Sequence, residues 1–269
     1  MTISDLISAA SSLLQEAGIA TARLDVLVLL EDVTGKDRGW LLAHPEFELD
    51  TKIATKLQKM VQKRALHIPL AYIRGKTEFY GREFKVSPHT LEPRPESETM
   101  IELFKSISLT EHAILGDIGC GSGALGITAA LERPGIQPVF IDIDQDALAI
   151  TKYNSRQHNI KGQYYVGNLL DAWSMPYDVL LCNLPYVPEN HTINQAAMQE
   201  PHHAIFGGSD GLDLYRTLFT QLSAGACGKP IVLTESLPFQ HRTLRKIAEE
   251  HGYKEAKESD FIQVFKYYA

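Results

Sequence analysis

The segment Asn183, Leu184, Pro185 and Tyr186 is the most distinctive chemical feature of the sequence. It follows an apolar run, residues 177–182, that has the pattern of a buried strand. The Asn183 side-chain oxygen and the Leu184 carbonyl can each accept one hydrogen of a flat amino group. The Tyr186 ring can cover the face of that group, and Pro185 stiffens the turn. Fixing both hydrogens directs the nitrogen lone pair at an electrophile, so we expect these four residues to be catalytic.

A glycine-rich segment upstream predicts where the electrophile binds. Residues 114–126 have the pattern of a strand, a glycine turn and the start of a helix. A second strand then ends in Asp142, about twenty residues after the turn, where open α/β sheets commonly place an acid that binds ribose hydroxyls. The two segments together predict a nucleoside-containing cofactor lying across the strand ends.

The sequence favours S-adenosyl-L-methionine over a dinucleotide as that cofactor. Gly121, Gly123 and Gly126 do match the G-x-G-x-x-G fingerprint, but a lone match of this kind is weak. Asp117 stands just before the turn, where a carboxylate would repel a pyrophosphate yet could contact the ammonium group of methionine. The amine-holding segment also has no role in hydride transfer.

Several further segments point to one family. They are residues 75–81, 84–86, 92–98, 117–125, 183–186, 200–201, 207–212 and 233–235. The glycine turn marks only the broad methyltransferase class, whereas the run Arg94, Pro95 and Glu96 and the loop 207–211 are more specific. In this order the segments resemble the HemK-type protein-(glutamine-N5) methyltransferases, which methylate a glutamine of class-I peptide chain release factors. The resemblance runs nearly end to end.

The resemblance implies N5-methylation of the glutamine in the Gly-Gly-Gln loop of a release factor, with S-adenosyl-L-methionine as cofactor. It also implies that Asn168 and Leu169 hold the adenine. The expected cofactor-binding residues are then Asp117, Gly119, Cys120, Gly121, Ser122, Gly123, Asp142, Asn168, Leu169 and Asn183. One departure concerns Leu184, where the family usually has a proline. Leucine keeps the carbonyl but adds an N–H donor and frees φ.

Composition places the chain among ordinary soluble proteins. It has 269 residues, 44% hydrophobic and 22% charged. No apolar run approaches the ~20 residues of a membrane span, and the start lacks the pattern of a signal peptide. The three cysteines have no metal spacing, and we read Cys120 and Cys182 as small space-filling thiols. We therefore expect a cytoplasmic protein without a membrane partner or bound metal, and a monomer.

Charge is unevenly divided along the chain. Residues 1–76 hold ten basic and nine acidic residues, whereas the remainder carries a net charge of −8. Proteins that grip long nucleic acids usually present a basic surface. The acidic larger part therefore argues against nucleic acid as the main substrate.

The organisation of the chain predicts three parts. Residues 1–75 carry helical patterns near 4–18, 20–34, 38–43 and 51–65, which indicate a small bundle. We expect this bundle to dock the substrate or to act as a lid, and the alternative is a packing appendage with no direct role. Residues 76–108 read as a hairpin and a linker helix. Residues 109–269 alternate strands, near 113–118, 137–142, 162–166, 177–182 and 230–235, with helices, and end in a strand pair near 252–257 and 261–267. The predicted fold is α/β, a class I methyltransferase (Rossmann-like), mainly parallel sheet with helices on both faces and an antiparallel edge.

Two further candidates remain open. The loop 187–206 holds His191, His202 and His203 without metal-ligand spacing, so we expect it to order over the acceptor, anchored by Glu200 and the glycines 207–211. Glycines 207 and 208 can also indicate a tight turn that needs positive φ. Glu235 ends a late strand, and it either faces the acceptor pocket or lies in solvent.

Two other functions fit parts of the sequence. The first is N6-adenine methylation of RNA or DNA, because the same grip suits an exocyclic adenine amine and the Asn-Leu-Pro-Tyr form is similar to that of RNA adenine dimethyltransferases. The acidic balance and the family-like loops argue against it. The second is a non-catalytic module that binds a translation factor, against which the intact acceptor segment argues.

Overall fold

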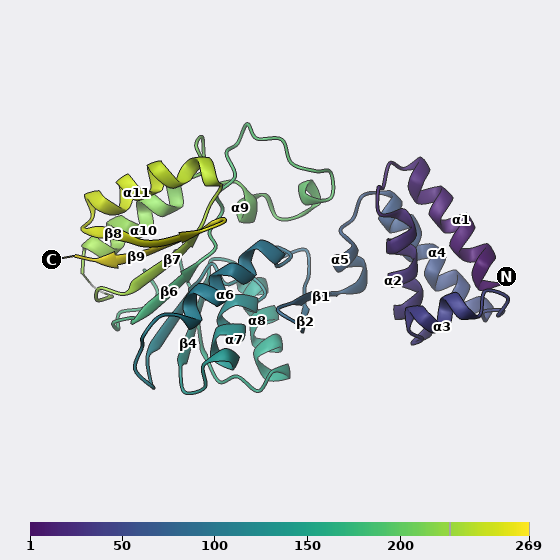
Figure 1. Cartoon of the computed structure of the whole chain (residues 1–269), viewed down its shortest axis with the longest axis horizontal. Coiled ribbons are helices and arrows are strands. Elements are labelled where there is room, and N and C mark those ends of the chain that lie inside the picture. The colour runs from purple at the N-terminus through teal and green to yellow at the C-terminus, as the bar shows by residue number, and fades with distance from the viewer. Residues whose placement is uncertain (226, 269) are drawn as a thin grey trace. The chain divides into compact units, whose positions relative to one another are not determined.

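The computed structural model describes residues 1–225 and 227–268. It divides into two compact units. The first comprises Met1–Gly75 together with Asn194–Gln199, and the second comprises Lys76–Ile193 together with the described residues from Glu200 onward. Figure 1 shows the elements of both units along the chain.

The first unit is helical, as the sequence predicts. Its helices are α1 (Ile3–Glu16), α2 (Ala22–Thr34), α3 (Arg38–Ala43), α4 (Thr51–Ala65) and α5 (Leu70–Arg74). Helix α1 begins with a capping box between Thr2 and Asp5. Leucines from the first four helices form its core. Helix α5 was not predicted, because five residues after Pro69 are too short to show a helical period.

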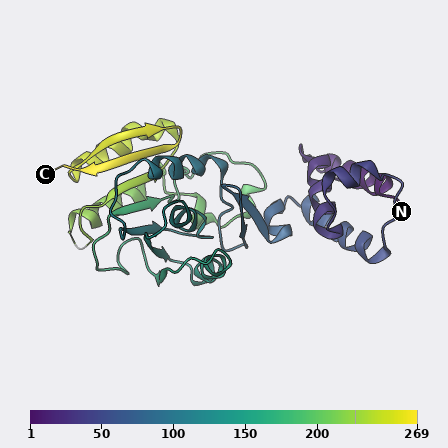
Figure 2. The ribbon, with the colours of Figure 1, turned by 60° about the horizontal axis from the view of Figure 1, so that its bottom comes forward.

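A seven-stranded sheet forms the centre of the second unit. Its strands are β3 (Ile114–Ile118), β4 (Gln137–Asp142), β5 (Gln163–Val166), β6 (Val179–Cys182), β7 (Ile231–Glu235), β8 (Tyr253–Ser259) and β9 (Ile262–Tyr267). The spatial order is β5-β4-β3-β6-β7-β9-β8. The first five strands are parallel, whereas β9 pairs antiparallel with both β7 and β8. The predicted mainly parallel sheet with an antiparallel edge is therefore confirmed, and Figure 2 shows that edge from a second side.

Helices cover both faces of this sheet. The longer ones are α6 (Glu98–Lys105), α7 (Ala124–Glu132), α8 (Gln145–Gln157), α10 (Asp213–Ser223) and α11 (His241–Glu250). Side chains along a strand alternate between the faces, so Leu181 packs with α6 and α7 while Leu180 packs with α10 and α11. The predicted hairpin is β1 (Lys76–Phe79) with β2 (Arg82–Lys85), and a short helix α9 (His202–Ile205) lies in the long loop. No helix in the described part of the chain has the length and apolar character of a membrane span.

The strand register brings the sequence motifs to one edge. Ile118 on β3 is level with Ile141 on β4 and Cys182 on β6, and Cys182 is level with Thr234 on β7. The next residues on the strands therefore form a row at the carboxyl edge of the sheet, in the order Asp142, Gly119, Asn183, Glu235. Ligands of open α/β sheets bind at this edge.

Candidate active site

The turn after β3 has the conformation that its glycines allow. Gly119, Gly121 and Gly123 have φ values of 69°, 54° and 77°, a region that other residues rarely adopt. The Gly119 N–H donates to the Ile141 carbonyl at 2.8 Å, and the Gly121 N–H donates to Asp142 Oδ2 at 2.8 Å. The turn is thus bonded to the end of the neighbouring strand, and its shape is fixed before any ligand arrives.

Two buried side chains of α8 form hydrogen bonds to backbone carbonyls of the glycine turn. The Thr151 hydroxyl donates to the Gly121 carbonyl at 2.8 Å. The Asn154 amide donates to the Ser122 carbonyl at 2.8 Å and to the Lys85 carbonyl at 2.9 Å. Sequence reasoning missed both residues. The available signal was two polar residues, three apart, on the buried face of an amphipathic helix.

The two predicted carboxylates are buried and hold backbone groups. Asp117 Oδ2 accepts the Gly126 N–H at 2.9 Å, and Asp117 as a whole is 2% exposed. Burial, with a smaller contribution from the nearby charge of Asp142, raises the pKa of Asp117 to about 7. Burial also raises the pKa of Asp142, although the N–H groups of Gly121 and Asp144 oppose this. Both side chains also line the cavity, so they can contact a ligand as well.

Asn183 and its neighbour Leu184 are held at the end of β6. The Asn183 Nδ2 group donates to the Ser97 hydroxyl at 3.0 Å, which turns its Oδ1 atom away from Ser97. Ser97 ends a 3-10 turn, Pro95–Ser97, and is 2% exposed. Leu184 is also 2% exposed and packs in the core beneath the cavity.

The hydroxyl of Tyr215 contacts the last residue of β6 and the last residue of β7. It lies 3.0 Å from the Cys182 carbonyl and 2.5 Å from the Glu235 carbonyl. Burial raises the pKa of Tyr215, while the backbone N–H of Leu184 acts in the opposite direction.

Tyr186 and Glu235 form a buried pair. The Tyr186 hydroxyl donates to Glu235 Oε1 at 2.9 Å, and Glu235 is fully buried. Burial raises the pKa of both groups. The interpretation of Glu235 as a solvent-facing strand end is wrong, because the residue is fully buried and Tyr186 bonds to its carboxyl group.

One cavity within the second unit collects most of the predicted site residues. From the predicted set it is lined by Asp117, Gly119, Cys120, Gly121, Ser122, Asp142, Asn168, Leu169, Asn183, Leu184 and Pro185. Gly123 and Tyr186 are not among its lining residues. Gly123 instead begins α7, where a Cβ would meet Thr151 at 2.7 Å. Tyr186 turns its hydroxyl to Glu235 rather than to the cavity.

The cysteines are buried free thiols, as expected. Burial raises the pKa of Cys120 and of Cys182, so both stay neutral and act as small packing residues. Cys120 lies within the turn and contributes to the cavity lining.

The long loop is anchored where the sequence indicated. Glu200 pairs with Arg94 and accepts the Glu92 N–H at 3.0 Å, and it is 6% exposed. Of the two glycines, only Gly208 has a positive φ, at 94°. Gly207 is required for a different reason, because a Cβ there would lie 2.2 Å from the Pro185 carbonyl. The prediction of positive φ was therefore right for one glycine and wrong for the other.

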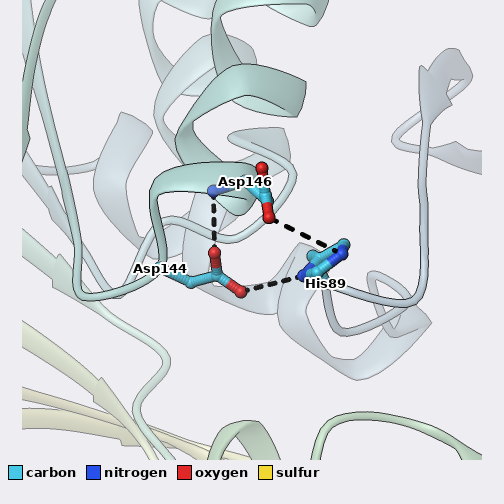
Figure 3. Close-up of side chains that lie close together, drawn as sticks. All are labelled: His89, Asp144 and Asp146. Carbon is cyan, nitrogen blue, oxygen red and sulfur yellow. Dashed lines mark hydrogen bonds and ion pairs between the residues drawn. The ribbon is translucent and has the colours of Figure 1, made fainter.

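A group that the sequence did not predict lies beside the cavity. His89 Nδ1 is 3.2 Å from Asp144, and His89 Nε2 is 3.8 Å from Asp146 (Figure 3). The three ligand-type atoms lie within 4.8 Å of one another, a spacing that a metal ion could use. Asp144 also caps α8 by accepting the Asp146 N–H at 2.7 Å. These hydrogen bonds explain the arrangement, and we assign no metal ligand here.

The fold and this row of residues define a class of enzyme. A mainly parallel seven-stranded sheet carries three features at its carboxyl edge. They are a glycine turn after β3, an acid at the end of β4 and the segment Asn183–Tyr186 after β6. This is the arrangement of a class I methyltransferase. A methyltransferase structure from Pyrococcus furiosus has the same fold, with a TM-score of 0.51 at 14% identity, covering 70% of this chain and 89% of that one.

The sequence comparisons define the family. Residues 5–75 match the PrmC N-terminal domain, and residues 96–204 match the Methyltransferase small domain. The release factor glutamine methyltransferase of Coxiella burnetii is 34% identical over 87% of this chain and 86% of its own length. That of Bacillus subtilis is 30% identical over 87% of this chain and 84% of its own. The chain belongs to the release factor glutamine methyltransferase family.

Proposed function

We propose that this protein transfers a methyl group from S-adenosyl-L-methionine to the side-chain amide of a glutamine in the Gly-Gly-Gln loop of a peptide chain release factor. The observation that supports this best is the row of Asp142, Gly119 and Asn183 on three adjacent strands. Such a row would place a nucleoside-type cofactor directly beside the side chain that we propose binds the acceptor amide.

The residues present suit the proposed cofactor. When bound, S-adenosyl-L-methionine supplies a methyl group on a sulfonium, an electrophile that needs no metal. Asp142 can accept from ribose hydroxyls, and Asn168 and Leu169 line the cavity beyond it. Asp117 is a buried carboxylate without a cationic side chain bonded to it in the described residues, and an ammonium group would stabilise its charge.

Asn183 and Leu184 would hold the acceptor amide. Because Asn183 Nδ2 is bonded to Ser97, its oxygen is the atom left to accept a hydrogen of the glutamine –NH2 group. The Leu184 carbonyl would accept the second. The glutamine nitrogen would take the methyl group as the carbon–sulfur bond breaks and neutral S-adenosylhomocysteine leaves, and the cationic product would lose its proton to water. Charge builds up on nitrogen during this step, and two fixed oxygens stabilise it.

We further propose that the first unit docks the protein substrate. The four lysines of α4, at positions 52, 56, 59 and 63, are spaced four, three and four residues apart and share one helix face. All four are exposed, and no acidic residue occurs in Thr51–Ala65. None makes an ion pair within the described residues. Such a face suits an acidic protein surface.

Mass spectrometry of a purified release factor tests the function. After incubation with the protein and cofactor, the peptide containing the Gly-Gly-Gln sequence should gain one methyl group on its glutamine. The Asn183→Ala variant is the matched control and should give far less methylated peptide in the same reaction time. Parallel reactions with labelled cofactor and total RNA test the adenine alternative, and label in RNA alone would overturn the proposal. Tight binding of release factor without any transfer would support the binding-module alternative.

A further inference from the structure

A buried glutamine outside the sequence motifs joins three segments of the second unit. Gln240 ends the 3-10 turn Pro238–Gln240, which follows β7, and it is 3% exposed. Its Oε1 atom accepts the Leu237 N–H at 2.8 Å. Its Nε2 group donates to the Tyr186 carbonyl at 2.8 Å and to the Asp210 carbonyl at 2.7 Å. The proposed function gives Gln240 no task.

These three partners fix the orientation of the Gln240 side-chain amide. A primary amide has one acceptor oxygen and one –NH2 group with two hydrogens to donate. One partner of Gln240 is an N–H and the other two are carbonyls, so a single orientation satisfies all three. Turning the amide over would set its oxygen against two carbonyl oxygens. Both carbonyls would then lose their donor, which costs free energy at a buried position.

Tyr186 is held at two points by residues at and after the end of β7. Its hydroxyl donates to Glu235 Oε1 at 2.9 Å, and its main-chain carbonyl accepts from Gln240 Nε2. Tyr186 is the last residue of the acceptor segment, residues 183–186, which begins directly after β6. These two hydrogen bonds therefore fix the far end of the acceptor segment relative to β7.

The second carbonyl that accepts from Gln240 belongs to the loop 207–211. Gly211 in this loop has a φ of 80°, and a Cβ on it would lie 2.0 Å from the Tyr186 carbonyl and 2.5 Å from Gln240 Nε2. The loop backbone thus passes so close to the acceptor segment that a side chain does not fit between them. Gln240 joins the two segments at the point where their backbones meet.

We propose that Gln240 is a positioning residue, which fixes the main chain of Tyr186 and with it the acceptor segment that carries the Asn183 oxygen. The inference rests on the proposed function of the acceptor segment. None of the three hydrogen bonds of Gln240 reaches the glycine turn after β3 or the acid at the end of β4. Gln240 therefore acts on the acceptor amide and not on the cofactor.

The first test uses two variants, Gln240→Glu and Gln240→Met. The carboxylate keeps the shape of the side chain but has no hydrogen for the two carbonyls, and the thioether removes the same donors without adding a charge. For both we expect kcat at saturating cofactor and release factor to fall at least about tenfold, because small misplacements at a reacting centre are costly. The KM for release factor and the Kd for cofactor should each stay within about threefold of wild type. An unchanged kcat in Gln240→Met would overturn the inference.

A count of cofactor sites separates positioning from loss of folded protein. Calorimetry with S-adenosyl-L-methionine gives the fraction of each variant that binds cofactor, and kcat is then expressed per binding site. The fall in kcat should remain after this normalisation. If it disappears, Gln240 only stabilises the fold and the inference is wrong.

The matched control is Gln221→Glu, on α10. The Gln221 side chain makes the same kind of bonds to a different loop, since its Oε1 accepts the Leu170 N–H at 3.0 Å and its Nε2 donates to Asp171 at 2.8 Å. This variant should leave kcat per site at saturating cofactor within about twofold of wild type, because it does not touch the acceptor segment. An equal fall in kcat for Gln221→Glu and Gln240→Glu would show that the effect is not specific to the acceptor segment.

A further measurement does not depend on turnover. Protein labelled with 13C at the tyrosine carbonyl and with 15N in valine gives signals from two Tyr–Val peptides, Tyr165–Val166 and Tyr186–Val187. The first is told apart by its loss in Val166→Ala and serves as the internal control. The Tyr186 carbonyl signal should shift in Gln240→Met, because it loses its donor, while the Tyr165 signal stays in place.

The two possible failures are distinguishable in this measurement. An unmoved Tyr186 signal, or an equal shift of the Tyr165 and Tyr186 signals, would refute the inference even if the protein methylates release factor. A shift of the Tyr186 signal alone, in a protein that methylates no release factor, would instead refute the proposed function and leave the placement of Tyr186 by Gln240 intact.

Discussion

Asn183 is held by its nitrogen, and this is what makes its oxygen available. An asparagine at the end of a buried strand could face either way, because the two ends of an amide have nearly the same shape. In this structure Nδ2 donates to the Ser97 hydroxyl, and Oδ1 is directed away from Ser97. Removing the Asn183 side chain should therefore reduce methyl transfer to the acceptor far more than it weakens cofactor binding. The glycine turn keeps its shape in that variant, because it has its own hydrogen bonds to β4.

The corresponding prediction is that Asn183→Ala lowers kcat for release factor methylation about 100-fold, the usual cost of losing one fixed hydrogen-bond partner of a developing charge. Calorimetry should show the Kd for S-adenosyl-L-methionine within about threefold of wild type. The contrasting variant is Asp142→Ala, which should weaken cofactor binding instead. Retained turnover in Asn183→Ala would show that the amide is held elsewhere.

We expect Asp117 to make cofactor binding depend on pH. In the free protein its pKa is raised to about 7, so the carboxyl is largely protonated below that pH and ionised above it. A bound ammonium group would favour the ionised form and lower this pKa. Binding then releases a proton below pH 7, and affinity should be full above pH 7 and fall as the pH drops through it, by up to about tenfold per pH unit.

Calorimetry between about pH 6 and pH 8, in buffers that differ in ionisation enthalpy, measures this proton release. Asp117→Asn is the matched control, because the amide keeps the shape and cannot titrate in this range. A pH-independent affinity in the wild type would show that no cation binds beside Asp117.

At the scale of the elements, the sequence predicts the polar residues at the carboxyl ends of the strands. It does not predict the side-chain contacts between segments that are distant in the sequence. The apolar runs before Asp117, Asp142 and Asn183 each place a polar residue at the carboxyl end of a buried strand, and parallel strands bring such ends together. Ser97 and Asn183 are separated by 86 positions, and Tyr186 and Glu235 by 49. The periodicity of a single helix or strand does not relate residues so far apart. These two contacts therefore follow only from the register of β6 and β7 and from the position of the segment that leads into α6.

The loop after α9 packs on the acceptor segment through backbone rather than side chains. Gly207→Ala would bring a Cβ to 2.2 Å from the Pro185 carbonyl, so one of the two segments must move. We expect kcat over KM for release factor to fall at least about tenfold while cofactor affinity is retained, because small misplacements at a reacting centre are costly. Steady-state kinetics with calorimetry checks both.

Gly39→Ala is the control for that variant, since Gly39 also has an ordinary φ and its added Cβ would meet only the carboxyl tip of Asp37, at 3.1 Å. The control should leave both quantities unchanged. If Gly207→Ala behaves like Gly39→Ala, the loop does not set the position of Pro185.

For the whole molecule, charge is segregated by segment. Helix α4 carries five basic residues and no acid, whereas the chain from residue 77 onward has a net charge of −8. Of these five, Arg64 is already paired with Asp25 at 2.7 Å, but the four lysines project into solvent. Exposed lysines on a helix can also interact with water alone, and a functional test distinguishes this from docking.

The test is the double substitution Lys56→Glu with Lys59→Glu. If the face docks an acidic surface of the release factor, KM for the whole factor should rise about tenfold at low salt, and the difference from wild type should shrink as the ionic strength approaches 1 M. The kcat for a short peptide with the Gly-Gly-Gln sequence should not change, because the peptide lacks the docking surface. Lys161→Glu with Lys246→Glu changes the net charge equally at two exposed lysines of the second unit. If both double substitutions raise KM equally, the effect comes from the net charge of the protein and not from a contact made by α4. Only a local contact would make the α4 substitutions differ from those elsewhere on the surface.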